Sequence, residues 1–293
     1  MAAMELPLVI GVDGSDFSLR ALDWAVDAAA RHGWPLRLVH ASLWERYEGV
    51  VPSFGGSRPS QQVWAENIVA SATERAQLRN PEVKVSGEVV AEDPADALVR
   101  ESEEASAVIV GSRGRGRLAQ MLLGSVSLSA AGRAHCPVIV VRGGQANVDG
   151  SFKRLILGVS EDTGPSSASA AFAVREAQVR GSELLALHIW RAPAGENVLD
   201  GGFSAEAEHH HEQRARRTLE RALEGLPDPG PGVLRPETFE GQARQVLLDA
   251  GSTADLLIVG ARRRKGSLGL QLGPVNHALL HYAPCPVAVV SEE

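Results

Sequence analysis

The chain contains one long pattern of residues twice. AHCPVIVV at 134–141 matches APCPVAVV at 283–290, and SAVIVGSRG at 106–114 matches ADLLIVGARR at 254–263. The matched glycines and cysteines recur at one interval of 149 residues (111 to 260, 136 to 285). Solenoid repeats have periods of only about 20–50 residues, so this interval indicates duplication of a whole domain.

A polar, glycine-rich segment lies between the two copies. It reads RGGQANVDGS at 142–151, a composition typical of a boundary between domains. The length of 293 residues also suggests about two domains. We therefore expect a first domain at 1–143 and a second at 151–293.

Each half alternates the patterns of strands and helices. Short apolar runs, typical of buried strands, are separated by longer segments with apolar residues at helical spacing. The runs are LPLVIGV, PLRLVHA, KVSGEVVA, AVIVG and PVIVVR in the first half, and RLILGVS, ELLALHIW, VLRPETFE, DLLIVG and PVAVV in the second. Strands that are apolar on both faces predict a parallel sheet covered on both sides. The predicted fold class is α/β, with two tandem doubly wound domains that each hold a five-stranded parallel sheet.

Composition and charge exclude several classes of function. Hydrophobic residues make up 44% and charged residues 22% of the chain, which is ordinary for a globular protein. The net charge of −7 disfavours broad nucleic-acid binding. The start, MAAMELPLVIGVDGS, lacks a basic region followed by a long apolar run, and no uncharged stretch is long enough to span a membrane. We expect a cytoplasmic protein without membrane or nucleic-acid partners.

The two cysteines are expected to be core residues. Cys136 and Cys285 each precede a proline within an apolar run. Such thiols are more often buried than paired in a disulfide or bound to a metal.

The predicted topology indicates where a ligand would bind. In parallel sheets, ligands lie beyond the carboxyl ends of the strands, where the winding direction switches. The residues that follow the strands there are Asp13, Ala41 and the segment GSRGRGRLAQMLLGSVS at 111–127.

This segment has the features of a phosphate cradle. Gly111 and Gly114 allow the backbone to approach a ligand closely. A helix that starts at Ser125 offers unpaired N–H groups and the positive end of its dipole. The hydroxyl groups of Ser125 and Ser127 and the charge of Arg113 add further donors for a polyphosphate.

Two standard nucleotide motifs are absent. A Walker loop requires Gly-Lys-Ser/Thr, but Gly116 is followed by Arg117 and Leu118. GRGRLA fits the loose dinucleotide pattern, but no acidic residue lies between Glu104 and Asp149 to hold a ribose. The chain also lacks G-x-S-x-G and H-E-x-x-H, so no convincing nucleophile–base pair emerges.

Other polar clusters have simpler interpretations. The adjacent histidines of EHHHEQRARR at 208–217 point in different directions on a helix, so we expect a solvated surface and not a metal site. RRRK at 262–265 is a local anion site or a solvated loop. His40 and His188 occupy equivalent strand ends, where a ligand contact and a structural hydrogen bond are both open. No protein cage for a metal is visible, although Mg²⁺ could arrive with a polyphosphate.

The spacing of the loop resembles that of a known family. Gly111, Gly114, Gly124 and Ser125 follow the pattern G-x2-G-x9-G-S, which is similar to the ATP-binding loop of the universal stress protein family. VIGVDGS near the start and CPVIVV at the end of the first half resemble that family too. The resemblance covers nearly the whole chain as two tandem domains. It implies the sheet order 3-2-1-4-5, which brings strands one and four together at the switch point.

The resemblance also implies roles for particular residues. Asp13 would contact adenine, and the backbone at Ala41 would flank the base. Gly111 and Gly114 would approach the ribose and phosphates, with Arg113 beside them. The phosphates would be received by Gly124, Ser125, Val126 and Ser127.

The second half departs from the pattern at three positions. Ser160 replaces Asp13, Arg263 replaces Gly114, and Pro274, which has no N–H, replaces Ser125. We therefore expect a weakened or altered second nucleotide site. Its candidate residues are Ser160, Ile189, Gly260, Arg262, Arg263, Gly273, Val275 and Asn276.

The resemblance implies a regulatory, ATP-binding protein of the stress response, with little or no hydrolysis. ATP, with or without Mg²⁺, is the expected ligand, and a homodimer formed through the apolar last strand is the expected assembly. Two alternatives stay open. One is a slow ATPase that uses the same cleft, and the other is a nucleotide-independent interaction scaffold.

Overall fold

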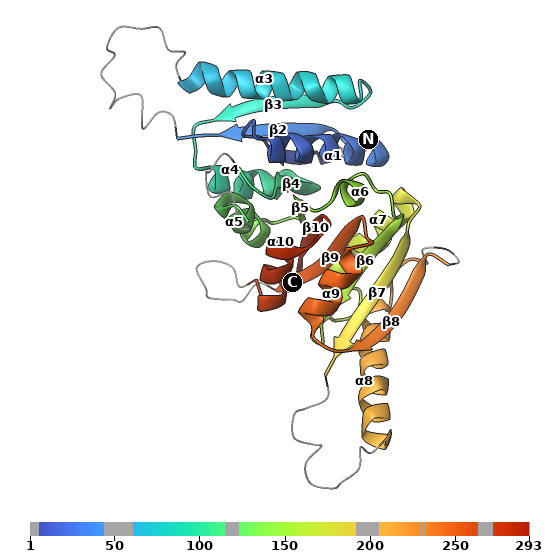
Figure 1. Ribbon diagram of the computed structural model, residues 1–293. Helices are drawn as coiled ribbons and strands as arrows, with labels where there is room; N and C mark the ends of the chain where they lie inside the picture. Colours follow the sequence, from blue (N-terminus) through green and yellow to red (C-terminus); the bar gives the residue numbers. More distant parts are fainter. Residues whose placement is uncertain are drawn as a thin grey trace. The chain divides into compact units, whose positions relative to one another are not determined.

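The first half of the chain folds around a parallel sheet with the strand order β3-β2-β1-β4-β5 (Figure 1). The computed structural model describes residues 6–43, 61–114, 123–191, 205–228, 230, 232–262 and 272–292. These separate into a first unit that ends at Arg142 and a second that starts at Gly143. The strands of the first unit are β1 (Leu8–Gly11), β2 (Leu36–Ala41), β3 (Val85–Val90), β4 (Ala107–Gly111) and β5 (Val138–Val141).

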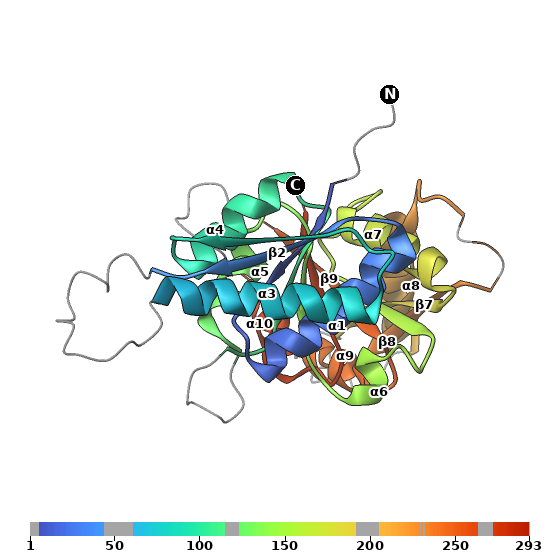
Figure 2. The ribbon, with the colours of Figure 1, turned by 90° about the horizontal axis from the view of Figure 1, so that it is seen from above.

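Helices cover both faces of this sheet, as the two-sided apolar strands predict. Within the first unit α1 packs against α3, and α4 packs against α5 (Figures 1 and 2). Both β4 and β5 are buried along their whole length. The helices are α1 (Asp16–His32), α3 (Gln61–Arg79), α4 (Pro94–Glu101), followed by the 3-10 turn η1 (Ser102–Glu104), and α5 (Ser125–Arg133).

Local signals explain the bounds of α1. Ser15 is its N-cap, and the Ser15 hydroxyl accepts the N–H of Ser18 at 3.2 Å. Gly33 ends the helix with a φ of 73°, the left-handed conformation that favours glycine.

The second half repeats the architecture in the strand order β8-β7-β6-β9-β10. Both sheets therefore have the predicted order 3-2-1-4-5 and parallel strands. Pro236 lies in the edge strand β8, where a missing N–H is tolerated. The strands are β6 (Arg154–Val159), β7 (Glu183–Trp190), β8 (Leu234–Glu240), β9 (Leu256–Arg262) and β10 (Val287–Glu292). The helices are α6 (Gln145–Val148), α7 (Ala168–Arg180), α8 (Ala205–Leu223), α9 (Ala243–Gly251) and α10 (Pro274–Tyr282).

The polar segment at 142–151, whose composition predicts a domain boundary, packs against the second unit through Gly143 and Asn147. Gly143 has a φ of 89°, and a Cβ there would lie only 1.9 Å from the carbonyl oxygen of Pro284. Asn147 is buried, and its Nδ2 lies 3.2 Å from the carbonyl oxygen of Gly251 and 2.8 Å from that of Ala254. The side chain therefore donates to carbonyl groups at the end of α9 and in the segment that joins α9 to β9.

The structure tests the expectation that both cysteines are core residues. Cys285 is buried as expected, whereas Cys136 is only partly buried.

Within the part of the chain that the structure describes, no helix combines the length and the apolar character that crossing a bilayer requires.

Candidate functional site

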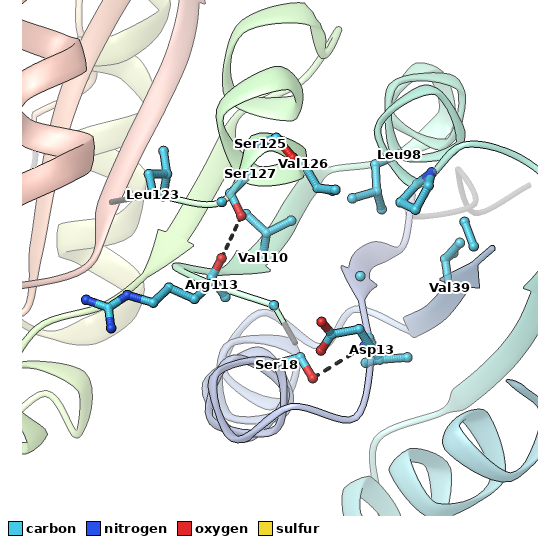
Figure 3. A pocket seen from close by; sticks show the side chains of 17 residues that line it. Asp13, Ser18, Val39, Leu98, Val110, Arg113, Leu123, Ser125, Val126 and Ser127 are labelled. Carbon is cyan, nitrogen blue, oxygen red and sulfur yellow. Dashed lines mark hydrogen bonds between the residues drawn. The ribbon is translucent and has the colours of Figure 1, made fainter. Parts of the chain in front are cut away.

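A cavity of about 580 Å³ opens at the carboxyl ends of β1, β2 and β4, between the starts of α1, α4 and α5 (Figure 3). Because β1 and β4 are neighbours in the sheet, this is the switch point of the topology. Every residue predicted for the first site lies along its wall. These residues are Asp13, Ala41, Gly111, Arg113, Gly114, Gly124, Ser125, Val126 and Ser127.

Apolar side chains line much of the same cavity, and the motif did not predict them. They include Val39, Leu98, Val110 and Leu123. Val39 precedes Ala41 by two residues, and side chains at that spacing share one face of a strand. The alternation along β2 is thus the signal that could have identified Val39, whereas Leu98 depends on how α4 packs.

The start of α5 is open to an anion. Gly124 is its N-cap, and no side chain among the described residues caps it. The N–H of Leu128 donates to the carbonyl of Gly124 and closes the first turn. The N–H groups of Ser125, Val126 and Ser127 therefore have no partner within the helix, and they lie at the positive end of its dipole.

The hydroxyl groups of the two serines have different roles. Ser127 is buried, and its Oγ donates to the carbonyl oxygen of Gly111 at 2.7 Å. This bond ties α5 to the end of β4, so the hydroxyl proton of Ser127 is engaged within the protein. Ser125 is exposed at the cavity wall. Ser125 is therefore the better hydroxyl donor to a ligand, while Ser127 offers its backbone N–H.

Asp13 is held by the residues that begin α1. Its Oδ1 accepts the N–H of Ser15 at 2.9 Å and the hydroxyl of Ser15 at 2.6 Å. The other carboxylate oxygen faces Gly114, because a Cβ on Gly114 would lie 2.6 Å from Oδ2. Glycine at 114 thus lets the loop and the carboxylate of Asp13 share this edge of the cavity.

Gly111 and Gly124 of the motif have different surroundings. A Cβ on Gly111 would lie 2.7 Å from the carbonyl oxygen of Phe17, so this glycine lets the backbone of α1 pack on β4. A Cβ on Gly124 would meet its nearest neighbour, the Cα of Arg113, at 3.7 Å, which is ordinary contact. Gly111 is therefore needed by the fold itself, and Gly124 leaves space at the start of α5.

Arg113 and Asp13 provide the charge of the cavity. They are the only charged side chains among the described lining residues. The guanidinium carbon of Arg113 lies 5.2 Å from the centre of the Phe17 ring, a cation–π arrangement. Figure 3 shows this side chain extending away from Asp13. The positive charge of Arg113 thus lies apart from the carboxylate of Asp13.

The strand-end histidines make structural hydrogen bonds. His40 Nδ1 lies 2.7 Å from the carbonyl oxygen of Val12, and His188 Nδ1 lies 3.0 Å from that of Val159. Both rings are buried. His40 lies between Val39 and Ala41, so its side chain is on the face of β2 opposite to the cavity. Of the two interpretations left open, the structural bond is the one observed.

The second unit has a smaller cavity of about 400 Å³ at the same end of its sheet. Ser160, Gly260 and Arg262 line it. Its other described lining residues lie in the loop before α7, in the first residue of α7 and at the end of β10, and the remaining candidates are not among them. Those remaining candidates are Ile189, Gly273, Val275 and Asn276, while Arg263 lies outside the described residues.

The start of α10 differs from that of α5. Its first residue is Pro274, which supplies no N–H. Asn276 donates from Nδ2 to the carbonyl oxygen of Gly260 at 2.8 Å, as Ser127 does to Gly111 in the first unit. Asn276 therefore preserves the link between helix and strand, while the helix start has lost a donor.

The adjacent histidines of α8 interact locally. A ring nitrogen of His209 lies 2.8 Å from the amide nitrogen of Gln213, and His211 stacks on Trp190 with ring centres 6.1 Å apart. Among the described residues, no group of three or more histidine, cysteine or acidic side chains has the arrangement of a metal site.

Comparisons with known proteins agree with this architecture. A model of the universal stress protein family matches residues 6–142 and again residues 151–291. A universal stress protein of Mycobacterium tuberculosis is 34% identical over 301 residues, which cover 97% of this chain and 97% of the relative. A universal stress protein of Mycolicibacterium smegmatis is 32% identical, with 99% of this chain and 98% of the relative covered.

A solved structure shows the same fold. A universal stress protein from Archaeoglobus fulgidus superposes with a TM-score of 0.64 at 18% identity, and the match covers 97% of this chain and 98% of that one. The repeat in the sequence, the two sheets of order 3-2-1-4-5 and the double family match lead to one assignment. The chain belongs to the universal stress protein family and carries two family domains in tandem.

Proposed function

We propose that the first unit binds an adenine nucleotide, with ATP as the working ligand, and acts as a regulatory module. The observation that carries the proposal is the uncapped start of α5, which faces the same cavity as the end of β4 and the carboxylate of Asp13. Three unpaired N–H groups and a helix dipole form a site for phosphate oxygens. A volume of about 580 Å³ falls within the usual range of about 300–1,000 Å³ for ligand pockets.

The two ends of the cavity suit the two ends of a nucleotide. Val39, Leu98 and Val110 supply apolar surface for a base. Asp13 lies at this side with one carboxylate oxygen engaged by Ser15 and the other toward Gly114. Gly124, Ser125 and the first N–H groups of α5 receive the phosphates, and the charge of Arg113 lies beside them. A bound Mg²⁺ would come with the polyphosphate.

Binding without rapid turnover fits this set of side chains. Asp13 is the only carboxylate among the described lining residues, and Ser15 already donates to it twice. A carboxylate held in this way is a poor general base, because hydrogen bonds to the charged form stabilise it. A slow ATPase remains the second candidate. ATP turnover that survives purification and is lost in Asp13→Ala would favour it.

Ser125→Glu tests the proposed cradle. Glutamate at the first position of α5 is favourable for the helix dipole, so the variant should fold. Its carboxylate would occupy the space of a phosphate and repel it, so we expect at least a tenfold loss of ATP affinity by calorimetry. Ser71→Glu, on the exposed side of α3, makes the same charge change away from the cavity. Equal ATP affinity in the two variants would reject the cradle.

The second unit has a different role in this account. We propose that the domain at 151–293 keeps the fold without an intact nucleotide loop and serves as an interaction scaffold, beside a nucleotide-binding domain at 1–143. The cytoplasmic location and the homodimer expected from the sequence stay predictions. Light scattering of the purified chain would test the homodimer.

A further inference from the structure

The helix that follows the first strand is shorter in the second unit. In the first unit α1 runs for 17 residues between its N-cap Ser15 and the left-handed Gly33. In the second unit α7 runs for only 13 residues between its N-cap Ser167 and the left-handed Gly181. The difference corresponds to about one helical turn of 3.6 residues. Because both helices end at the same kind of glycine, the missing turn is the first one.

That missing turn leaves space beside the strand-end glycine. In the first unit the first turn of α1 fills the equivalent space, because the carbonyl oxygen of Phe17 would lie 2.7 Å from a Cβ on Gly111. In the second unit, the nearest atom to a Cβ on Gly260 is Oε1 of Glu292, also at 2.7 Å. A carboxylate thus lies where the first unit has the backbone of a helix.

Glu292 makes specific contacts there. Its Oε2 accepts the N–H of Ala168 at 2.9 Å, and its Oε1 accepts the N–H of Ser169 at 3.1 Å. The hydroxyl of Ser167 accepts the next N–H, that of Ala170, at 3.1 Å. The first three N–H groups of α7 are therefore satisfied from within the chain. A negative charge at this end of a helix is also stabilised by the dipole.

The carboxylate lies in the cavity that holds the remains of the second nucleotide site. Glu292 lines the cavity of about 400 Å³ together with Ser160, Gly260 and Arg262. The nearby cation is itself engaged, since Arg262 Nη1 lies 3.6 Å from Asp162 Oδ2. A phosphate brought to the backbone of Gly260 would meet a like charge within a few ångströms, where repulsion between charges is strongest.

The first unit carries no equivalent group. Strand β5 ends at Val141, whereas β10 starts at the corresponding position and continues two residues further, to Glu292. At the repeat interval, Glu292 corresponds to Gly143. The longer last strand is what delivers a carboxylate to the second cavity.

We propose that Glu292 is an internal anion that keeps nucleotide phosphates out of the second unit, and so determines that the chain binds nucleotide in its first unit. This inference rests on the proposed function of the first unit. It assigns the loss of the second site to a particular side chain, in addition to the altered loop. Glu292 also has a structural role, because the same carboxylate caps α7.

Glu292→Gln is the decisive variant, because it removes the charge and keeps an oxygen that can accept an N–H of α7. We measure ATP binding by calorimetry on the full chain. The wild type should take up about one ATP per chain, and Glu292→Gln should show a second site with at least tenfold tighter binding than the wild-type second unit. Glu220→Gln, on the exposed side of α8, makes the same charge change and should leave the stoichiometry unaltered.

The outcomes separate this inference from the function on which it rests. A Glu292→Gln chain that still binds one ATP overturns the inference and leaves the first site intact. No ATP bound by the wild type overturns the proposed function instead. The double variant Ser125→Glu, Glu292→Gln should bind ATP more tightly than Ser125→Glu alone, which locates the new site in the second unit. If circular dichroism shows that Glu292→Gln does not fold, the same ATP-binding measurements on Glu292→Ala test the inference.

Discussion

At the scale of single residues, the glycines of the motif G-x2-G-x9-G-S differ in what they contact. The backbone of α1 packs on Gly111, whereas Gly124 leaves space at the start of α5, where a Cβ would meet only ordinary contacts. The spacing of the motif identified both glycines, but it did not show that Gly111 packs against α1 while Gly124 does not. Contacts between distant segments cannot be read from spacing, and Glu292 is the clearest example, since 124 residues separate it from Ala168.

Gly111→Ala and Gly124→Ala should therefore differ in their effects. The first places a Cβ 2.7 Å from the carbonyl oxygen of Phe17 and must displace α1, which typically costs about 1–3 kcal/mol of stability. The second meets only ordinary contacts at a φ of −64° and should change the free energy of unfolding by less than about 1 kcal/mol. Urea denaturation without nucleotide tests the pair. A Gly124→Ala chain less stable than Gly111→Ala would contradict this assignment.

Cys136 should be inert in the folded protein. Burial raises the pKa of its thiol to about 12, so very little thiolate exists at pH 8. In the unfolded chain the thiol ionises near pH 8.5, so its contribution to stability is present below that pH and is lost as the pH rises toward 12. Iodoacetamide should modify Cys136 slowly at pH 8 and rapidly in denaturant, as mass spectrometry of the peptide would show. Equal rates in both states would refute this prediction.

At the scale of elements, the short apolar runs predicted the strands of both units, because each strand is specified by its own residues. The run AVIVG, for example, is β4 (Ala107–Gly111). The segment at 142–151 shows the limit of this reasoning. Its glycines and polar residues indicate a linker, yet Gly143 and Asn147 fit it against the second unit through contacts with residues far along the chain.

Asn147→Ala should destabilise the second unit. The substitution removes the buried side-chain donor to the carbonyl of Ala254, and the loss of a donor to a buried acceptor typically costs about 1–3 kcal/mol. Gln145→Ala is the matched control on the same short helix, because the side chain of Gln145 is exposed and bonds only locally to Asp149. Thermal unfolding should show a clear loss for Asn147→Ala and little for the control. Equal losses would mean that Asn147 is not the anchor of this segment.

At the scale of the whole molecule, one duplicated fold presents different side chains at the carboxyl ends of its two sets of strands. The sheets have the same order, and Ser127 and Asn276 make the same bond from helix to strand. The first edge has the start of α5 beside a large cavity. At the second edge the equivalent helix α10 starts with Pro274, and the carboxylate of Glu292 caps α7 beside a smaller cavity. The sequence predicted a weaker second site from Arg263 and Pro274, but not the closure by Glu292.

The most direct test of this account is to denature the purified chain and count the adenine nucleotide released, then to titrate nucleotide-free protein with ATP. We expect saturable binding of about one ATP per folded chain, because the first unit has the larger cavity with the start of α5 at its wall, whereas Pro274 removes an N–H from the equivalent helix start of the second unit. A folded chain that neither copurifies with nucleotide nor binds added ATP would contradict the central claim, and the nucleotide-independent scaffold would then be the better description.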